Sequence, residues 1–291
     1  MYAAISPSSE AITEPKKIIV DGKAQLTFAA NDKGDTRLKN LFQSDPVRIL
    51  FPNAPKEDIS QAVVVTTSGG LVGGDKIAIE IEAEAGASAL VTAQSAEKIY
   101  RSAGENAEIS VDLKAGAGSW LEYLPQETIL FEGSRLMRQT SIDVEEDGKL
   151  LAGEMIVFGR LGHGENFKSG LVHEGWEVSK AGRRVWADAL HLKDNIAAVM
   201  ADPACFDGAV AMATALYIGP DAKEHLATAR ALLDNQESAT LMGATFVNEV
   251  LVMRWLGPDA FDLRKDFGAF WGAFRKKVAG LPETLPRLWN M

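Results

Sequence analysis

Residues 77–87 read IAIEIEAEAGA, and this stretch decides the class of fold. Apolar and polar side chains alternate along 77–84, so one face of an extended chain is apolar and the other holds three glutamates. The same alternation recurs at 108–114 and at 142–145, and glycine-containing turns separate the runs. Strands at this spacing predict a layered antiparallel sheet, a sandwich or a solenoid rather than βαβ units. No fixed-period repeat singles out the solenoid.

The last third of the chain changes from strand patterns to helix patterns. Pro220 suits a first helical turn, and apolar residues then follow at helical spacing, which predicts a helix over about 220–234. A second helix is predicted over 261–278, with an aromatic stripe on one face. We interpret this stripe as core packing, with a docking surface for a partner as the alternative. No Pro/Ser-rich linker intervenes, so we expect one mainly β domain over 1–291 that has helices near its C-terminus and a flexible start at about 1–20.

Composition excludes several classes of function. The 291 residues are 46% hydrophobic and 24% charged, as in ordinary globular proteins. A formal charge of −10 argues against partners that are nucleic acids or anionic membranes. No apolar run reaches the length of a membrane span, and the N-terminus lacks the blocks of a signal peptide, so we expect a cytoplasmic protein. The single cysteine, Cys205, excludes internal disulfides, and its apolar neighbourhood predicts a buried, inert thiol.

The glycine-rich segment 68–75 resembles a phosphate loop in its glycine spacing only. Asp75 stands where such a loop needs a lysine, and its carboxylate would repel phosphate. We interpret the segment as a tight turn between two strands, with a functional loop as the alternative.

The residues define no reaction centre. His173-Glu174 begins a metalloprotease motif, but its second histidine is missing. Of four scattered histidines, His163 and His173, near Glu165 and Glu174, are the pair that could offer weak sites to a divalent metal. There is no nucleophile elbow, and paired carboxylates for glycoside chemistry are not singled out among 40 acidic residues.

Five segments resemble, in order, the motifs of one known family. They read TTSGGLVGGD at 66–75, VTAQSAEKIYR at 91–101, LPQETILF at 124–131, GRLGHGE at 159–165 and LPRLW at 285–289. These blocks are similar to those of the urease accessory protein UreD family, also called UreH. The first 20 residues show no match to the family pattern.

The resemblance implies a chaperone rather than an enzyme. Similar proteins have a β-solenoid-like stack of strands with a smaller helical portion. They join UreF and the GTPase UreG on nickel-free urease, where nickel enters the buried urease site. A polar internal tunnel is the expected route, with no tightly bound cofactor and nickel only in transit.

Acidic residues within the matched motifs are the candidates for nickel passage, because transient oxygen and nitrogen ligands suit passage better than a thiolate cage. The acidic candidates are Asp75, Glu97, Glu127 and Glu165, His163 in the fourth motif joins them, and Glu154, outside the motifs, is a further one. An ion pair with a neighbouring Lys or Arg is the alternative role for each carboxylate. Phe267, Trp271 and Trp289 are candidate contacts with UreF, since aromatic anchors often dominate interfaces.

Two other readings remain open. The first is a carbohydrate-active β-helix enzyme that uses paired carboxylates as acid and base. The second is a scaffolding protein with no connection to a metal.

Overall fold

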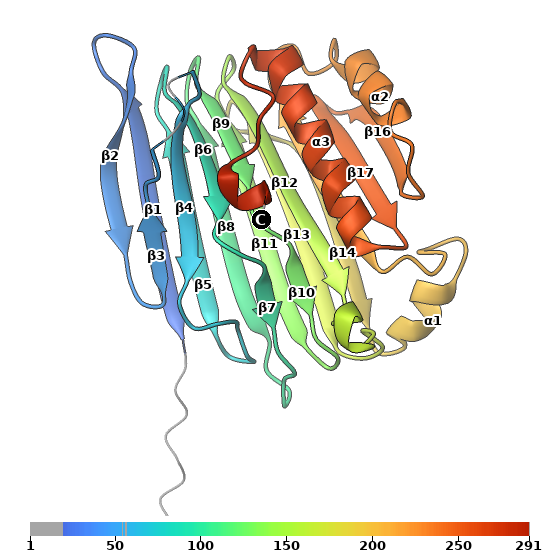
Figure 1. Cartoon of the computed structure of the whole chain (residues 1–291). Helices are drawn as coiled ribbons and strands as arrows, with labels where there is room; N and C mark the ends of the chain where they lie inside the picture. The colour runs from blue at the N-terminus through green and yellow to red at the C-terminus, as the bar shows by residue number, and fades with distance from the viewer. Residues whose placement is uncertain (1–19, 54, 56, 291) are drawn as a thin grey trace, which may run out of the picture.

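The computed structural model describes residues 20–53, 55 and 57–290, and their strands form two stacked sheets (Figure 1). The seven-stranded sheet has the order β14 (Arg183–Lys193), β13 (Leu171–Lys180), β11 (Arg135–Val144), β8 (Ala107–Ala115), β5 (Lys76–Ala83), β1 (Asp21–Ala30), β2 (Thr36–Gln43). The ten-stranded sheet has the order β16 (Leu241–Val247), β17 (Val250–Gly257), β15 (Ala211–Ile218), β12 (Lys149–Phe158), β9 (Trp120–Leu124), β6 (Ser88–Ala93), β4 (Ser60–Thr66), β3 (Val47–Leu50). Two short strands complete it, β7 (Glu97–Ile99) and β10 (Thr128–Leu130), which pair with each other and, through β10, with β12.

The chain passes back and forth between the sheets, so its central strands are parallel. β1, β5, β8, β11 and β13 run parallel in the seven-stranded sheet, and β4, β6, β9 and β12 do so in the ten-stranded sheet. This coiling confirms the solenoid-like stack. Ile77 pairs with Ile109, Ile109 with Arg138 and Arg138 with Glu174, so successive coils are 32, 29 and 36 residues long. The unequal lengths explain why the sequence shows no fixed period.

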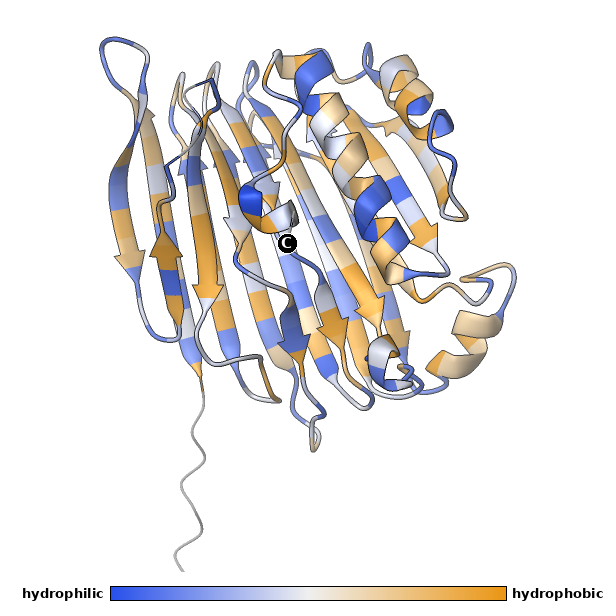
Figure 2. Cartoon of the chain, viewed as in Figure 1, coloured by the Kyte–Doolittle hydropathy of each residue, from blue (hydrophilic) through white to orange (hydrophobic). Residues whose placement is uncertain are grey.

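Two hydrophobic cores hold the molecule together. The first fills the space between the sheets with the inward side chains of the strands. Figure 2 shows hydrophobic and hydrophilic residues alternating along these strands. The predicted strands at 77–83, 109–113 and 142–144 are confirmed, and Ile79, Val111 and Ile142 are among the buried residues. The second core lies on the outer face of the ten-stranded sheet, where it is covered by helices and the C-terminal segment.

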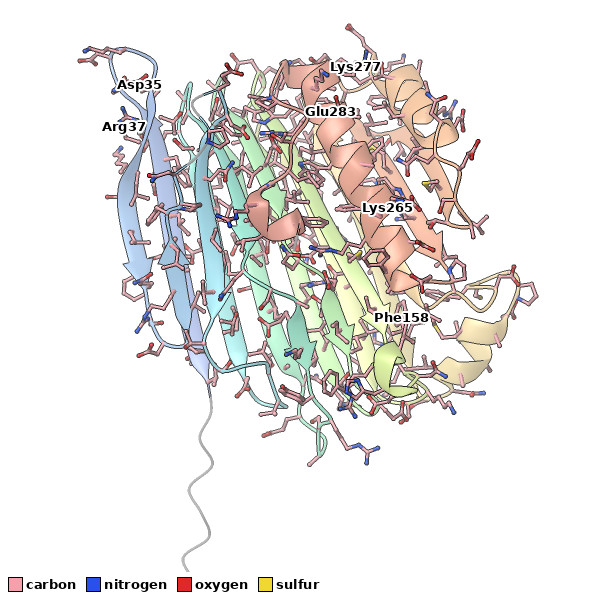
Figure 3. All side chains as sticks on the ribbon, in the orientation of Figure 1. Asp35, Arg37, Phe158, Lys265, Lys277 and Glu283 are labelled. Carbon is pink, nitrogen blue, oxygen red and sulfur yellow. The ribbon has the colours of Figure 1, made fainter. Side chains whose placement is uncertain are left out.

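The longest helix, α3 (Ala260–Ala279), confirms the helix predicted at 261–278. Asp259 caps its start by accepting hydrogen bonds from the backbone N–H groups of Phe261 and Asp262, at 2.8 and 3.0 Å. Gly280 ends it in the left-handed conformation at φ 67°. The outer face of α3 is charged, and Lys265 and Lys277 point away from the sheet (Figure 3).

The other helices are short: α1 (Ile196–Ala201), α2 (Leu226–Asp234), and the 3-10 turns η1 (Leu161–His163) and η2 (Arg287–Asn290). α2 begins later than the sequence predicts, because residues 220–225 form turns. Asp221 fixes these turns by accepting hydrogen bonds from Tyr217 at 2.6 Å and Lys149 at 2.5 Å. None of the described helices is both long and apolar enough to cross a membrane. The start at about 1–20, predicted to be flexible, lies outside the described residues except for Val20.

Candidate functional site

A polar cavity of about 110 Å³ lies between the two sheets. Arg138 enters it from the seven-stranded sheet, and Tyr123, Thr128 and Glu154 line it from β9, β10 and β12 of the other sheet. Glu97 lines it from β7. The volume exceeds the roughly 10–15 Å³ that one water molecule needs, so the cavity has room for several waters or a hydrated ion.

Strand alternation places the charges of this cavity inside the molecule. Along β11 the inward positions include Leu136, Arg138, Thr140 and Ile142, so the arginine is a charged residue on an otherwise uncharged inward face. Along β13 the inward positions include Val172, Glu174 and Trp176, and Glu174 stands opposite Arg138 in the parallel register. Each charge therefore faces inward because of its place in the strand.

Arg138 joins the two sheets through buried ion pairs. Its Nε donates to Glu174 Oε2 at 2.5 Å, and its Nη1 lies 2.9 Å from Glu154 Oε2. Nη1 also donates to Thr128 Oγ1 at 2.7 Å. Among the described residues, neither Arg138 Nη2 nor Glu174 Oε1 has a hydrogen-bond partner, although both atoms are buried. The cluster thus contains buried polar atoms without hydrogen-bond partners, and burying such atoms costs free energy.

The electrostatics of the cavity depend on burial. Removal from water raises the pKa of Glu154 and of Glu174, and Arg138 only partly offsets the effect. Although burial opposes the charge of Arg138, Glu154 and Glu174 together raise its pKa. Burial also raises the pKa of Glu97, which hydrogen bonds from Thr66 and the Lys98 backbone counteract. Arg138 therefore lies close to three carboxyl groups with raised pKa values, of which Glu97 and Glu154 line the cavity itself.

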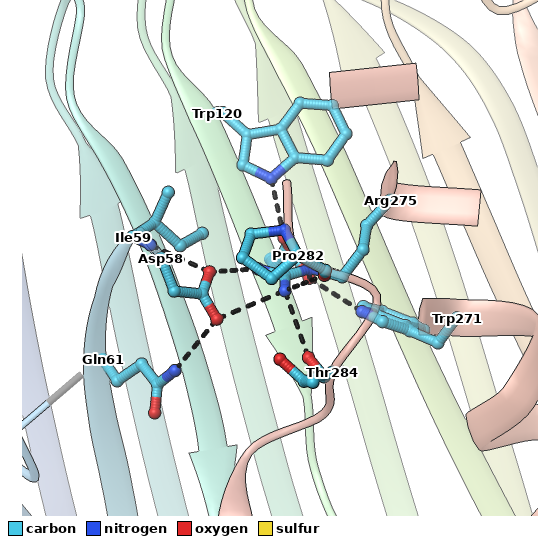
Figure 4. Close-up of polar contacts among 9 residues, drawn as sticks. Asp58, Ile59, Gln61, Trp120, Trp271, Arg275, Pro282 and Thr284 are labelled. Carbon is cyan, nitrogen blue, oxygen red and sulfur yellow. Dashed lines mark hydrogen bonds and ion pairs between the residues drawn. The ribbon is translucent and has the colours of Figure 1, made fainter. Parts of the chain in front are cut away.

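A second buried charge cluster lies under α3 (Figure 4). Glu122 is fully buried, and its carboxylate accepts hydrogen bonds from the indole N–H groups of Trp120 at 2.8 Å and Trp271 at 2.7 Å. Arg275 donates to Glu122 at 2.9 Å and to Asp58 at 2.6 Å. Every charge here is paired, so we interpret this cluster as the anchor of α3 rather than as a binding site.

The structure places the predicted nickel-passage residues in three locations. Glu97 and Glu154 line the cavity. Asp75 is buried in the turn before β5, where it accepts hydrogen bonds from the backbone N–H groups of Val72 at 2.8 Å and Val20 at 3.0 Å. Its carboxylate thus fixes the glycine-rich segment, which forms a turn between β4 and β5, as the sequence predicts.

The remaining candidates lie near an outer pocket, on the face of the ten-stranded sheet beside the start of α3. Glu127 and His163 line this pocket of about 570 Å³, and Glu127 forms an ion pair with Arg264. Glu165 pairs with Arg160 at 2.5 Å, and this hydrogen bond lowers the pKa of Glu165. The passage role of all these residues stays a prediction.

The predicted partner contacts are packing residues in the isolated chain. Phe267, Trp271 and Trp289 are 1%, 0% and 6% exposed and belong to the second core. Their side chains are not available at this surface, so a role in binding UreF stays a prediction. Phe261, in contrast, is 74% exposed at the first turn of α3. Cys205 is exposed, and the prediction of a buried thiol was wrong because Cys205 lies in the loop after α1.

Sequence reasoning missed Arg138, Glu174, Tyr123 and Thr128 as residues of the interior cluster. The sequence could have indicated Arg138 and Glu174, because each is a charged residue at an inward position of a strand with alternating side chains. Among the described residues, no three His, Cys, Asp or Glu side chains converge as a ready metal site.

These features define a class: a β-solenoid protein with a charged interior cavity and a helix-covered outer face. The family model described as UreD urease accessory protein matches residues 20–290. The chain is 42% identical to the urease accessory protein UreD of Magnetococcus marinus over 275 residues, which cover 94% of each chain. It is 39% identical to that of Azorhizobium caulinodans, covering 89% of this chain and 92% of the relative. It is 37% identical to that of Rhizobium rhizogenes, covering 97% and 98%.

The chain therefore belongs to the UreD family of urease accessory proteins. Its role is in the maturation of urease.

Proposed function

We propose that this protein is a urease maturation chaperone whose interior cavity passes nickel toward the urease active site. It does so in a complex with UreF and UreG on nickel-free urease, in the cytoplasm. The observation that supports this proposal is the polar cavity between the sheets, in which Glu97 and Glu154 face Arg138.

Buried carboxylates suit passage because their ligation can be reversible. Oxygen donors bind divalent nickel less tightly than a closed set of thiolates or imidazoles, so the ion can leave again. A carboxyl group with a raised pKa holds a proton when the ion is absent and releases it when the ion arrives, which lowers the cost of leaving the site empty.

Arg138 is the internal counter-ion in this scheme. Its guanidinium compensates Glu154 or Glu174 whenever either is ionised in the empty cavity, so the two side chains stay in place without a metal. An arriving divalent cation competes with the guanidinium for Glu154, while Arg138 keeps its hydrogen bonds to Glu174 and Thr128. In this scheme nickel passes by replacing Arg138 as the partner of Glu154.

The carbohydrate-enzyme reading finds no support in the interior carboxylates. Glu154 and Glu174 are each about 4% exposed, and a polysaccharide cannot reach them. Both are also paired with one arginine, which leaves neither free to work as acid and base.

The partner assignment is tested by co-purification. The tagged chain is expressed with nickel-free urease subunits, UreF and UreG, and the eluted proteins are identified. We expect urease and UreF to elute with the folded chain, and UreG to join them. If a folded bait retains none of the three, the proposed complex is wrong.

A further inference from the structure

Two histidines meet on the outer face of the seven-stranded sheet, away from the interior cavity. His173 of β13 and His191 of β14 are directly opposite in the antiparallel register. Their Nδ1 atoms are 3.3 Å apart, and their ring centroids are 5.4 Å apart at an interplanar angle of 62°. His173 is half-buried and His191 is exposed, so solvent and ions reach the pair.

The distance between the two Nδ1 atoms matches the distance between two nitrogen ligands of one metal ion. Two nitrogen donors that are each about 2.0–2.1 Å from a tetrahedral cation lie about 3.3–3.4 Å from each other. The two Nδ1 atoms have this spacing already. A rotation of the rings that turns both lone pairs toward one point is enough to ligate an ion, because the strands themselves hold the two side chains together.

The surroundings of His173 favour this use. Gly175, two residues along the same face, has no side chain, and a Cβ there would lie 2.2 Å from Gln139 Oε1 and 3.3 Å from His173 Nε2. The amide oxygen of Gln139 and Nε2 of His173 therefore both border the space above this glycine. Metal-ligating histidines commonly turn their other N–H toward a carbonyl oxygen, which leaves Nδ1 free for the metal.

We propose that His173 and His191 form a surface site for one borderline divalent transition-metal cation, such as Ni²⁺ or Zn²⁺. The two imidazoles provide two ligands, and water completes the coordination. Imidazole nitrogen is a preferred ligand of these ions, and the charge of −10 attracts cations to the protein surface. In the empty site one ring carries its proton on Nδ1, between the two rings. When the ion binds, this proton moves to Nε2 of the same ring, so the net charge of the two imidazoles does not change.

The test is a calorimetric titration of the full chain with NiCl₂ and, separately, with ZnCl₂. His173→Gln and His191→Gln are compared with the wild type and with Lys193→Gln, a control at an exposed residue of the same strand β14. We expect each of the first two variants to lose one binding event or to weaken it at least about tenfold, and the control to keep it. Equal binding by the wild type and both variants would overturn the proposal.

A spectroscopic readout decides the question without any variant. Long-range ¹H–¹⁵N correlation of the imidazoles with Zn²⁺ is expected to shift the Nδ1 resonances of both histidines together, at one ion per chain. Shifts at Nε2, or at one histidine alone, would contradict a shared ion. Glu97→Gln/Glu154→Gln is expected to leave these signals unchanged, so this site and the interior passage can fail separately.

Discussion

Arg138, which lines the polar cavity, forms ion pairs with two buried carboxylates, Glu154 and Glu174. Removing one partner of a buried ion pair leaves the other charge uncompensated, which typically costs about 3–5 kcal/mol. We therefore expect Arg138→Met to lower the free energy of unfolding at pH 8 by about this amount, measured by urea denaturation. The triple variant Arg138→Met/Glu154→Gln/Glu174→Gln, which removes the stranded charges, is expected to recover most of the loss. An Arg138→Met protein as stable as the wild type would show that Arg138 does not hold these carboxylates.

Glu154 gives the interior a dependence on pH. Because burial raises its native pKa above the ordinary 4.5, the native state holds this proton more tightly than the unfolded chain. The stabilising contribution is complete below about pH 4.5 and is lost as the pH rises through the native pKa. Glu154→Gln keeps the neutral form, so it is expected to be at least as stable as the wild type at pH 8 and to lose this advantage at pH 4.5. A variant clearly less stable at pH 8, with exposed Glu146→Gln as the control, would refute this.

α3 depends on one arginine for its attachment to the ten-stranded sheet. Arg275 is fully buried and contacts Glu122, Asp58 and the backbone oxygens of Pro282 and Thr284, so it joins the sheet, the helix and the tail. Arg275→Met should cost about 3–5 kcal/mol, because Glu122 and Asp58 lose their cation. Hydrogen exchange should speed up in α3 first and leave the protection of β8 and β11 unchanged. Uniform loss of protection across both sheets would mean that the cluster stabilises the whole stack instead.

The exposed start of α3 offers a partner contact that its buried stripe does not. Phe261 is 74% exposed beside the outer pocket, so Phe261→Ala should change stability by no more than about 0.5 kcal/mol. We expect it to reduce the amount of UreF that co-purifies, because exposed aromatic side chains are frequent anchors of interfaces. Exposed Lys277→Ala, near the other end of the helix, is the matched control and should retain UreF. Equal recovery with both variants would remove Phe261 from the interface.

Sequence patterns predicted individual elements better than their arrangement. The alternation at 77–83 and the aromatic stripe at 261–278 each reflect one apolar face, which a local pattern shows directly. The solenoid needed the family resemblance, because coils of 32, 29 and 36 residues have no common period. Glu97 was found through a motif, whereas Arg138 and Glu174 lie outside the matched motifs and meet only through strand register. The docking of Trp271 on Glu122, 149 positions away in sequence, could not be read from either segment alone.

At the scale of the whole molecule, the charge cluster under α3 and the interior cavity lie on opposite faces of the ten-stranded sheet. The outer face of the ten-stranded sheet is closed by α3 and its paired charges, while the space between the sheets keeps the cavity with Glu97 and Glu154. A solenoid suits this arrangement because successive coils repeat the inward positions, so polar residues from several coils line one space.

The central claim is that nickel passes through this cavity, and nickel loading of urease tests it most directly. Urease is co-expressed with UreF, UreG and either the wild-type chain, Glu97→Gln/Glu154→Gln, or the exposed control Glu145→Gln/Glu146→Gln, which changes the net charge equally. Purified urease is then assayed for nickel per active site, after co-purification has shown that each chain assembles. We predict that the wild type and the control load urease fully, while the cavity variant leaves most sites empty. Full loading by an assembled cavity variant would contradict the account.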